Sequence, residues 1–330
     1  MKEQPGSSGT AGEPQHHALS PSFVGSAGIA TVGGALIALQ ILFNGALGAA
    51  GSGPLLASFV SYLGTLVSAI LVIAVIGQAA EVFLTIRKKG RPWWFMVGVS
   101  GVPIVITTAW GAPILGVAVS AVCSIGGQTV AGLLLDSRGI GVKQRIPLTP
   151  NRILAAVIAV VGLALAIGPG ISELREPAVA AVAGVAIFIS GMLLAVLNAG
   201  NGAVAGISGN SFVPVVTSVI GGTITVSIIA AVMWALDLLP ASMFPAGSQW
   251  WMYLGGPAGM GIVLASTIAV RTLGTFGLTL IVVVGQMVTA LLIDLFIDGA
   301  MDWGALISSA VMVLAIFIAV QPRKENKQEV

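Results

Sequence analysis

The chain has 330 residues, of which 56% are hydrophobic and only 8% are charged, with a formal net charge of +2. Soluble domains carry about 25% charged residues, so this chain lacks the polar side chains that a water-facing surface needs. The composition excludes an ordinary soluble protein and predicts an all-α integral membrane protein, because lipid accepts an apolar surface. The 44 glycines agree, since small residues let membrane helices pack closely.

The apolar runs follow a polar start. Residues 1–21 are rich in Gly, Ser and Pro, which predicts a disordered N-terminal tail. A membrane crossing needs about 20 apolar residues, and ten runs are close to that length. They are 23–50, 55–84, 93–111, 113–135, 152–170, 177–207, 212–238, 250–269, 272–296 and 302–320. Short joins with Gly or Pro, such as Gly51 to Pro54, separate them.

The positive residues are distributed unevenly between the two predicted faces. With ten helices, every Lys and Arg except Arg175 falls on the face that holds both termini. Positive residues stay on the cytoplasmic side during membrane insertion. The distribution therefore predicts a multi-pass protein of the cytoplasmic (inner) membrane with both termini in the cytoplasm.

Sequence motifs recur at a constant separation. Asn44-Gly45-Ala46 recurs as Asn201-Gly202-Ala203, which is 201 − 44 = 157 positions later. The Trp pairs at 93–94 and 250–251 have the same separation, and residues 127–136 match 285–294 one position further on. These matches predict an internal repeat.

Each predicted repeat holds five helices, an odd number, so the second copy should cross the membrane in the opposite orientation. The first repeat is assigned to residues 22–170 and the second to 177–320. Residues 171–176 form the linker, and 321–330 form a cytoplasmic C-terminal tail. Inverted repeats of this kind are a common plan of secondary transporters.

The repeat residues also carry a family resemblance. They are Gln40, Asn44-Gly45, Leu47-Gly48, Pro54, Ala57-Ser58-Phe59, Ser61, Gly64-Thr65, Pro92-Trp93-Trp94, Gly98, Gly116, Gly127-Gln128 and Leu134-Leu135-Asp136. This pattern resembles the YdcZ-like family of inner-membrane exporters, in the drug/metabolite transporter superfamily. The resemblance covers roughly residues 25–320, and the second repeat departs from it at Leu197 and Pro214. It implies a fused two-repeat transporter and names no substrate.

Groups that carry catalysis or bind metals are missing from the predicted spans. They contain no serine–histidine pairing, no Cys/His metal spacing and no glycine-rich phosphate loop with its lysine. We expect no enzymatic activity, no metal and no cofactor. The acidic residues lie in tails, loops or helix ends, so we expect a path for a neutral, zwitterionic or amphiphilic molecule.

Amide side chains are the main polar groups inside the predicted spans. The candidates for substrate binding are Gln40, Asn44, Gln128, Asn198, Asn201 and Gln286. Hydrocarbon offers amides no hydrogen-bond partner, so they either line a substrate cavity or bond across helices and fix the packing. Gln128 and Gln286 form one repeat-related pair near the midplane, and Asn44 and Asn201 form another.

Asp136 and Asp294 end equivalent predicted helices. They fit a capping or headgroup-level role, and a gating or coupling role is the alternative.

The hypothesis from the sequence is export of a small organic metabolite or drug-like molecule by alternating access. A lipid or lipid-linked carrier flippase, or a non-transporting membrane partner or sensor, is the alternative. Membrane lipid and a small molecule are the expected partners, without nucleic acid, for a monomer or homodimer.

Overall fold

The structure is a computed structural model. It describes residues 21–140, 148–151, 176–239 and 247–298, together with 153–154, 157–158, 161, 306–307, 310–311 and 314. Every regular element in these ranges is a helix, which confirms the predicted all-α class. Two predicted spans, 152–170 and 302–320, lie largely outside the described residues, so the count of ten helices stays a prediction.

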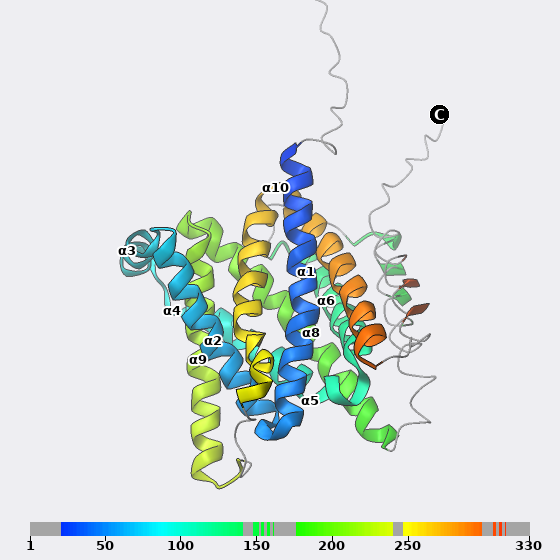
Figure 1. Ribbon diagram of the computed structural model, residues 1–330. Coiled ribbons are helices and arrows are strands. Elements are labelled where there is room, and N and C mark those ends of the chain that lie inside the picture. Colours follow the sequence, from blue (N-terminus) through cyan, green and yellow to red (C-terminus); the bar gives the residue numbers. More distant parts are fainter. Residues whose placement is uncertain are drawn as a thin grey trace, which may run out of the picture.

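Between residues 21 and 138 the structure describes eight helical elements. They are α1 (Pro21–Leu47), η2 (Gly48–Ser52), α2 (Gly53–Val75), α3 (Ala79–Lys89), α4 (Pro92–Met96), η3 (Val97–Gly101), α5 (Val102–Leu115) and α6 (Val117–Arg138). The second half contributes α8 (Pro177–Ser208), α9 (Phe212–Ala235), η4 (Gly247–Leu254), α10 (Gly255–Ile293) and η5 (Asp294–Asp298). Figure 1 shows the long helices gathered side by side into one bundle.

Six stretches of the described chain are long and apolar enough to cross a membrane. They are Val24–Val75, Pro92–Leu115, Val117–Leu135, Pro177–Ser208, Phe212–Ala235 and Gln249–Ala269. The first has 52 residues, which would extend about 78 Å as one straight helix, against about 30 Å of hydrocarbon. The positive φ angles of Gly51 (117°) and Gly53 (70°) break it into α1 and α2, as the sequence predicts.

The predicted helix 55–84 is wrong in its last third. α2 ends at Val75, Gly77 adopts a φ of 72°, and α3 follows as a separate helix from Ala79. The apolar composition continues through this turn, so hydropathy alone gives no sign of the break. The predicted division near residue 112 is confirmed, although the break lies at Gly116, whose φ is 80°.

α10 spans Gly255–Ile293, and the chain reverses its direction within this span. A Cβ added at Gly33 of α1 would lie 3.0 Å from the Cβ of Ala265, and one at the next residue, Gly34, would overlap the carbonyl oxygen of Val282. In a straight helix, Ala265 and Val282 would be about 25 Å apart. A first leg (255–269) and a second leg (278–293) therefore flank α1, as the yellow and orange ribbons do in Figure 1.

Close helix contacts recur between the two halves in a reciprocal pattern. Four backbone approaches without an intervening Cβ are Gly127 to Phe188, Gly285 to Thr31, Gly191 to Ser124, and Gly34 to Val282. At the repeat separations of 157 and 158 positions, the first approach corresponds to the second and the third to the fourth. Where a residue of one half contacts a residue of the other, the repeat equivalents of these two residues also contact each other, which is the pattern of a two-fold pairing.

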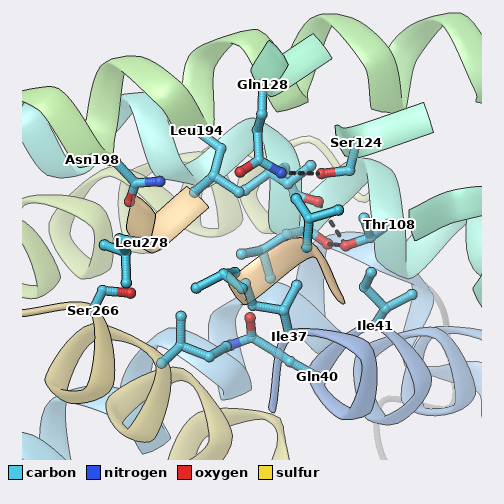
Figure 2. A pocket seen from close by; sticks show the side chains of 15 residues that line it. Ile37, Gln40, Ile41, Thr108, Ser124, Gln128, Leu194, Asn198, Ser266 and Leu278 are labelled. Carbon is cyan, nitrogen blue, oxygen red and sulfur yellow. Dashed lines mark hydrogen bonds between the residues drawn. The ribbon is translucent and has the colours of Figure 1, made fainter. Parts of the chain in front are cut away.

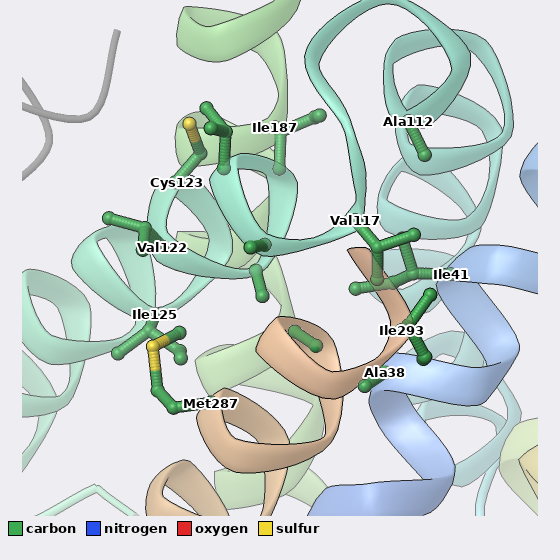
Figure 3. Packing of buried hydrophobic residues seen from close by; sticks show 14 of the residues in the cluster. Ala38, Ile41, Ala112, Val117, Val122, Cys123, Ile125, Ile187, Met287 and Ile293 are labelled. Atoms are coloured by element: carbon green, nitrogen blue, oxygen red, sulfur yellow. The ribbon is translucent and has the colours of Figure 1, made fainter. Parts of the chain in front are cut away.

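The largest buried cluster among the described residues lies between the halves. It joins Ala38 and Ile41 of α1 to Ile125 of α6, Ile187 of α8 and Met287 of α10. Figure 3 shows these side chains meeting where the four helices converge, with the buried thiol of Cys123 among them. The packing of this cluster fixes the positions of α1 and α6, which carry Gln40 and Gln128.

Candidate functional site

Two adjoining cavities lie between the halves of the bundle, each with a volume of about 90 Å³. We call the first the Gln128 cavity; its polar lining is Gln40, Thr108, Ser124, Gln128, Asn198 and Ser266. We call the second the Asn201 cavity; its polar lining is Gln40, Ser61, Tyr62, Thr65, Asn201 and Ser218. Both cavities share Gln40, Ile104, Val105, Leu194 and Ile262, so they are neighbours across a common wall.

Gln40 lies on α1 at the wall between the cavities. Its Nε2 donates a hydrogen bond to the backbone oxygen of Gly255, at 3.0 Å. A Cβ at Gly259 would come within 2.6 Å of this nitrogen, so the bare glycine makes room for the amide. The bond fixes the nitrogen end of the amide on α10, and the oxygen end remains available to a cavity ligand.

Gln128 reaches the Gln128 cavity from α6. Its Nε2 donates to the hydroxyl oxygen of Ser124, one helical turn earlier, at 3.1 Å. Figure 2 shows Gln128 and Gln40 on opposite sides of the cavity. The Thr108 hydroxyl donates to the Ile104 carbonyl oxygen at 2.6 Å, so this hydroxyl is satisfied by its own helix. The amides of Gln40 and Gln128 are therefore among the adaptable polar groups of the cavity.

The two asparagines of α8 divide between the cavities. Asn198 is exposed and lines the Gln128 cavity, while Asn201 lines the Asn201 cavity. They are three residues apart and share a helix face, as the sequence predicts. Asn201 Oδ1 is buried and has no hydrogen-bond partner among the described residues. A ligand with a donor group would satisfy this oxygen.

Asn44 and Gln286 line neither of these two cavities. Asn44 is 1% exposed, and its Oδ1 faces the bare backbone of Gly255 without a hydrogen-bond partner among the described residues. Gln286 is fully buried, and neither its oxygen nor its nitrogen has such a partner. The repeat pairs Gln128 with Gln286, but the structure gives the two amides different surroundings.

No charged side chain lines either cavity within the part of the chain that the structure describes. The walls combine aliphatic side chains with amides and hydroxyls. Such a site can hydrogen-bond a neutral or zwitterionic group, and its apolar walls suit a hydrocarbon portion.

Asp294 joins α10 to the start of α6. Its carboxylate accepts hydrogen bonds from the backbone nitrogens of Val117 at 3.3 Å and Ala118 at 3.0 Å. The carboxylate is 7% exposed and lies next to Gly116, where α5 ends. This is the capping geometry, and it connects the two halves. The side chain of Asp136, its repeat equivalent, lies outside the described residues.

Asn210 makes a further hydrogen-bonded connection between the halves, which the sequence analysis missed. It lies between α8 and α9, and its Nδ2 donates to Glu81 Oε1 at 2.8 Å and to Gln78 Oε1 at 3.3 Å. Its own Oδ1 accepts from the backbone nitrogen of Phe212 at 2.8 Å. An asparagine at a helix joint usually caps its own chain, so nothing in the sequence indicated the contact with α3.

Comparison with known families gives two matches along this chain. The family model described as "Putative inner membrane exporter, YdcZ" matches residues 26–165 and again residues 182–318. The chain belongs to this family. The two matches agree with the two repeats found in the sequence, and they confirm the resemblance.

The YdcZ family assignment and the apolar helices make this chain a multi-pass inner-membrane protein of an exporter family. No curated protein matches the sequence. A crystal structure of another protein matches with a TM-score of 0.61 at 15% identity, over 91% of this chain and 96% of the other. At that identity the likeness shows a shared fold alone.

The sequence analysis did not identify several of the residues that line the cavities of this YdcZ family member. They are the hydroxyl-bearing Ser61, Tyr62, Thr65, Thr108, Ser124, Ser218 and Ser266. Serine and threonine are common in membrane helices, where they hydrogen-bond to their own backbone. Their presence in a span therefore does not by itself indicate a cavity. Ser61 and Ser218 do match at the repeat separation, which was the one available indication.

Proposed function

We propose that the chain is a secondary transporter that exports a small neutral or zwitterionic organic molecule by alternating access between two inverted five-helix halves. The observation that carries this proposal is the pair of uncharged, amide-lined cavities between the halves. Substrate and coordinating amides would meet there, with Gln40 and Gln128 on opposite walls and Asn198 and Asn201 on α8.

The reciprocal glycine contacts support the two-fold part of the proposal, since each half offers the same two surfaces. Because each half has an odd number of helices, the two-fold axis that relates the halves lies in the membrane plane. Inverted halves have two nearly equivalent arrangements, one open to each side, which is the basis of alternating access.

Two contacts between the halves suit the gates of such a cycle. Asp294 joins α10 to α6, and Asn210 joins the α8–α9 joint to Glu81 of α3. In Figure 1, α3 lies toward the end of the bundle where α1 begins, and the orange leg of α10 ends toward the other. Both contacts are formed here. We propose that each breaks in turn to open one side, with Asp136 at the repeat-related position.

Flux in proteoliposomes tests the proposal. Purified protein is reconstituted and challenged with a panel of neutral and zwitterionic metabolites, in imposed gradients of protons or sodium. We expect protein-dependent flux of at least one compound, and loss of that flux in Gln128→Leu and Asn198→Leu. The matched control is Gln286→Leu, which removes the repeat-related amide outside the cavities and should retain flux.

Other results would redirect the assignment. Flux of fluorescent lipid instead of metabolites would favour a flippase, and absence of any flux from folded protein would contradict transport. Equal loss in all three variants would contradict the assignment of the cavities, because Gln286 lines neither of them.

A further inference from the structure

α3 is unlike the other principal helices of the bundle. Its 11 residues extend about 16 Å, which is about half of the hydrocarbon thickness. It follows the turn at Gly77, whose φ is 72°, and Figure 1 shows it protruding from the side of the bundle. A helix in this position cannot cross the membrane and lies beside the membrane-spanning helices.

One face of α3 is packed against the protein. Val82 is 2% exposed and belongs to a cluster with Trp94 of α4 and Val213 of α9. At the start of the helix, Glu81 and Gln78 accept hydrogen bonds from Asn210. These contacts fix the rotation of α3 about its own axis, so its outer face has a set direction.

The outer face carries large apolar side chains next to basic ones. Phe83 is 63% exposed and Leu84 is 47% exposed. Arg87 and Lys88 follow them four residues later and share their sides of the helix. Lys89 and Arg91 are also exposed, and none of these four cations forms a salt bridge with a described residue.

We propose that the outer face of α3 binds anionic phospholipid headgroups. A short helix with apolar and basic side chains on one exposed side lies in the membrane interface, with the rings and aliphatic groups among acyl chains and the cations at headgroup level. Lysine and arginine there are attracted to anionic lipid. Glu81, the one acidic residue of α3, accepts a hydrogen bond from Asn210 and forms no salt bridge with these cations.

Positive residues near a membrane helix also determine which side of the membrane their loop lies on. That role needs their charge and nothing else. The fixed orientation of α3 and the exposed Phe83 and Leu84 are additional features that a lipid surface explains. The proposal concerns lipid binding alone, so it stands or falls independently of the transported substrate.

The test uses the full chain in nanodiscs of phosphatidylcholine, with or without phosphatidylglycerol. Native mass spectrometry measures retained phosphatidylglycerol, and a thermal shift measures the stability that it adds. We expect Arg87→Gln/Lys88→Gln/Lys89→Gln to weaken retention on the order of a hundredfold and to remove the thermal gain. Phe83→Ser/Leu84→Ser should weaken retention while leaving every charge in place.

The matched control is Arg323→Gln/Lys324→Gln/Lys327→Gln, which removes one arginine and two lysines from the C-terminal tail. It should keep the wild-type retention. Equal losses in the two triple variants would overturn the proposal, since they would indicate general charge attraction. For wild-type protein, a thermal gain that persists in high salt would overturn it as well, because salt screens contacts at the surface.

Discussion

At the scale of single residues, Gln128 and Gln286 occupy equivalent positions in the two repeats but have different hydrogen-bond surroundings. Gln128 bonds to Ser124, whereas the residue at the equivalent place before Gln286 is Val282. Gln286 thus has no hydroxyl one turn earlier and lies fully buried without a hydrogen-bond partner among the described residues. A buried amide without partners raises the free energy of the folded state.

Replacing Gln286 should therefore stabilise the protein. Gln286→Met keeps the approximate volume and removes both unsatisfied polar atoms, so we expect the free energy of unfolding to rise by about 1–3 kcal/mol. A thermal-shift assay in detergent measures this change. Gln128→Met is the comparison and should show no gain, since it removes a formed hydrogen bond. A lower melting temperature for Gln286→Met would contradict the prediction.

At the scale of elements, the start of α6 depends on a residue far away in sequence. Gly116 ends α5 with a φ of 80°, and the first backbone nitrogens of α6 then point at the Asp294 carboxylate. A carboxylate at a helix start satisfies free N–H groups and interacts favourably with the helix dipole. The contact also ties the second leg of α10 to α6.

Asp294→Asn should lower the free energy of unfolding by about 1–2 kcal/mol, because the amide keeps one acceptor and loses the charge. Thermal unfolding in detergent measures the loss. The control is Asp237→Asn, at an exposed position with a φ of 54° that asparagine also tolerates. Comparable shifts in the two variants would show that the cap contributes nothing of its own.

The crossing of α6 and α8 depends on a missing side chain. A Cβ at Gly127 would overlap the carbonyl oxygen of Phe188, so Gly127→Ala must push the two helices apart. We expect a loss of about 1–3 kcal/mol in stability, measured as a lower melting temperature.

Gly132→Ala is the matched control on the same helix. A Cβ there would meet no atom within 4 Å, and alanine favours the helix over glycine by up to about 1 kcal/mol. Its melting temperature should stay equal or rise. A Gly127→Ala variant as stable as Gly132→Ala would contradict the close packing of α6 against α8.

At the scale of the whole molecule, the halves exchange equivalent contacts, with α1 against the second leg of α10 and α6 against α8. Each half therefore packs mainly by means of the other, and neither would bury its glycine faces alone.

Inversion of the halves predicts the sides of two equivalent loops. In a Cys123→Ala background, Lys89→Cys and Met243→Cys should react with an impermeant thiol reagent from opposite sides of the membrane. Arg323→Cys should label from the same side as Lys89→Cys, because both positions are predicted to be cytoplasmic. Labelling at 89 and 243 from one common side would contradict inverted repeats.

The sequence by itself determined the membrane class, most helix breaks, the repeat and the family, because hydropathy, glycine and proline positions and motif spacing are local properties. It also named six amides as candidates without deciding between cavity lining and packing, and four of them, among them Gln40 and Gln128, line the cavities. Only the tertiary structure decided that Gln286 lies outside those cavities, that Asp294 caps α6, and that Asn210 holds Glu81. These outcomes depend on how each helix rotates against partners more than a hundred residues away, and no local pattern encodes that rotation.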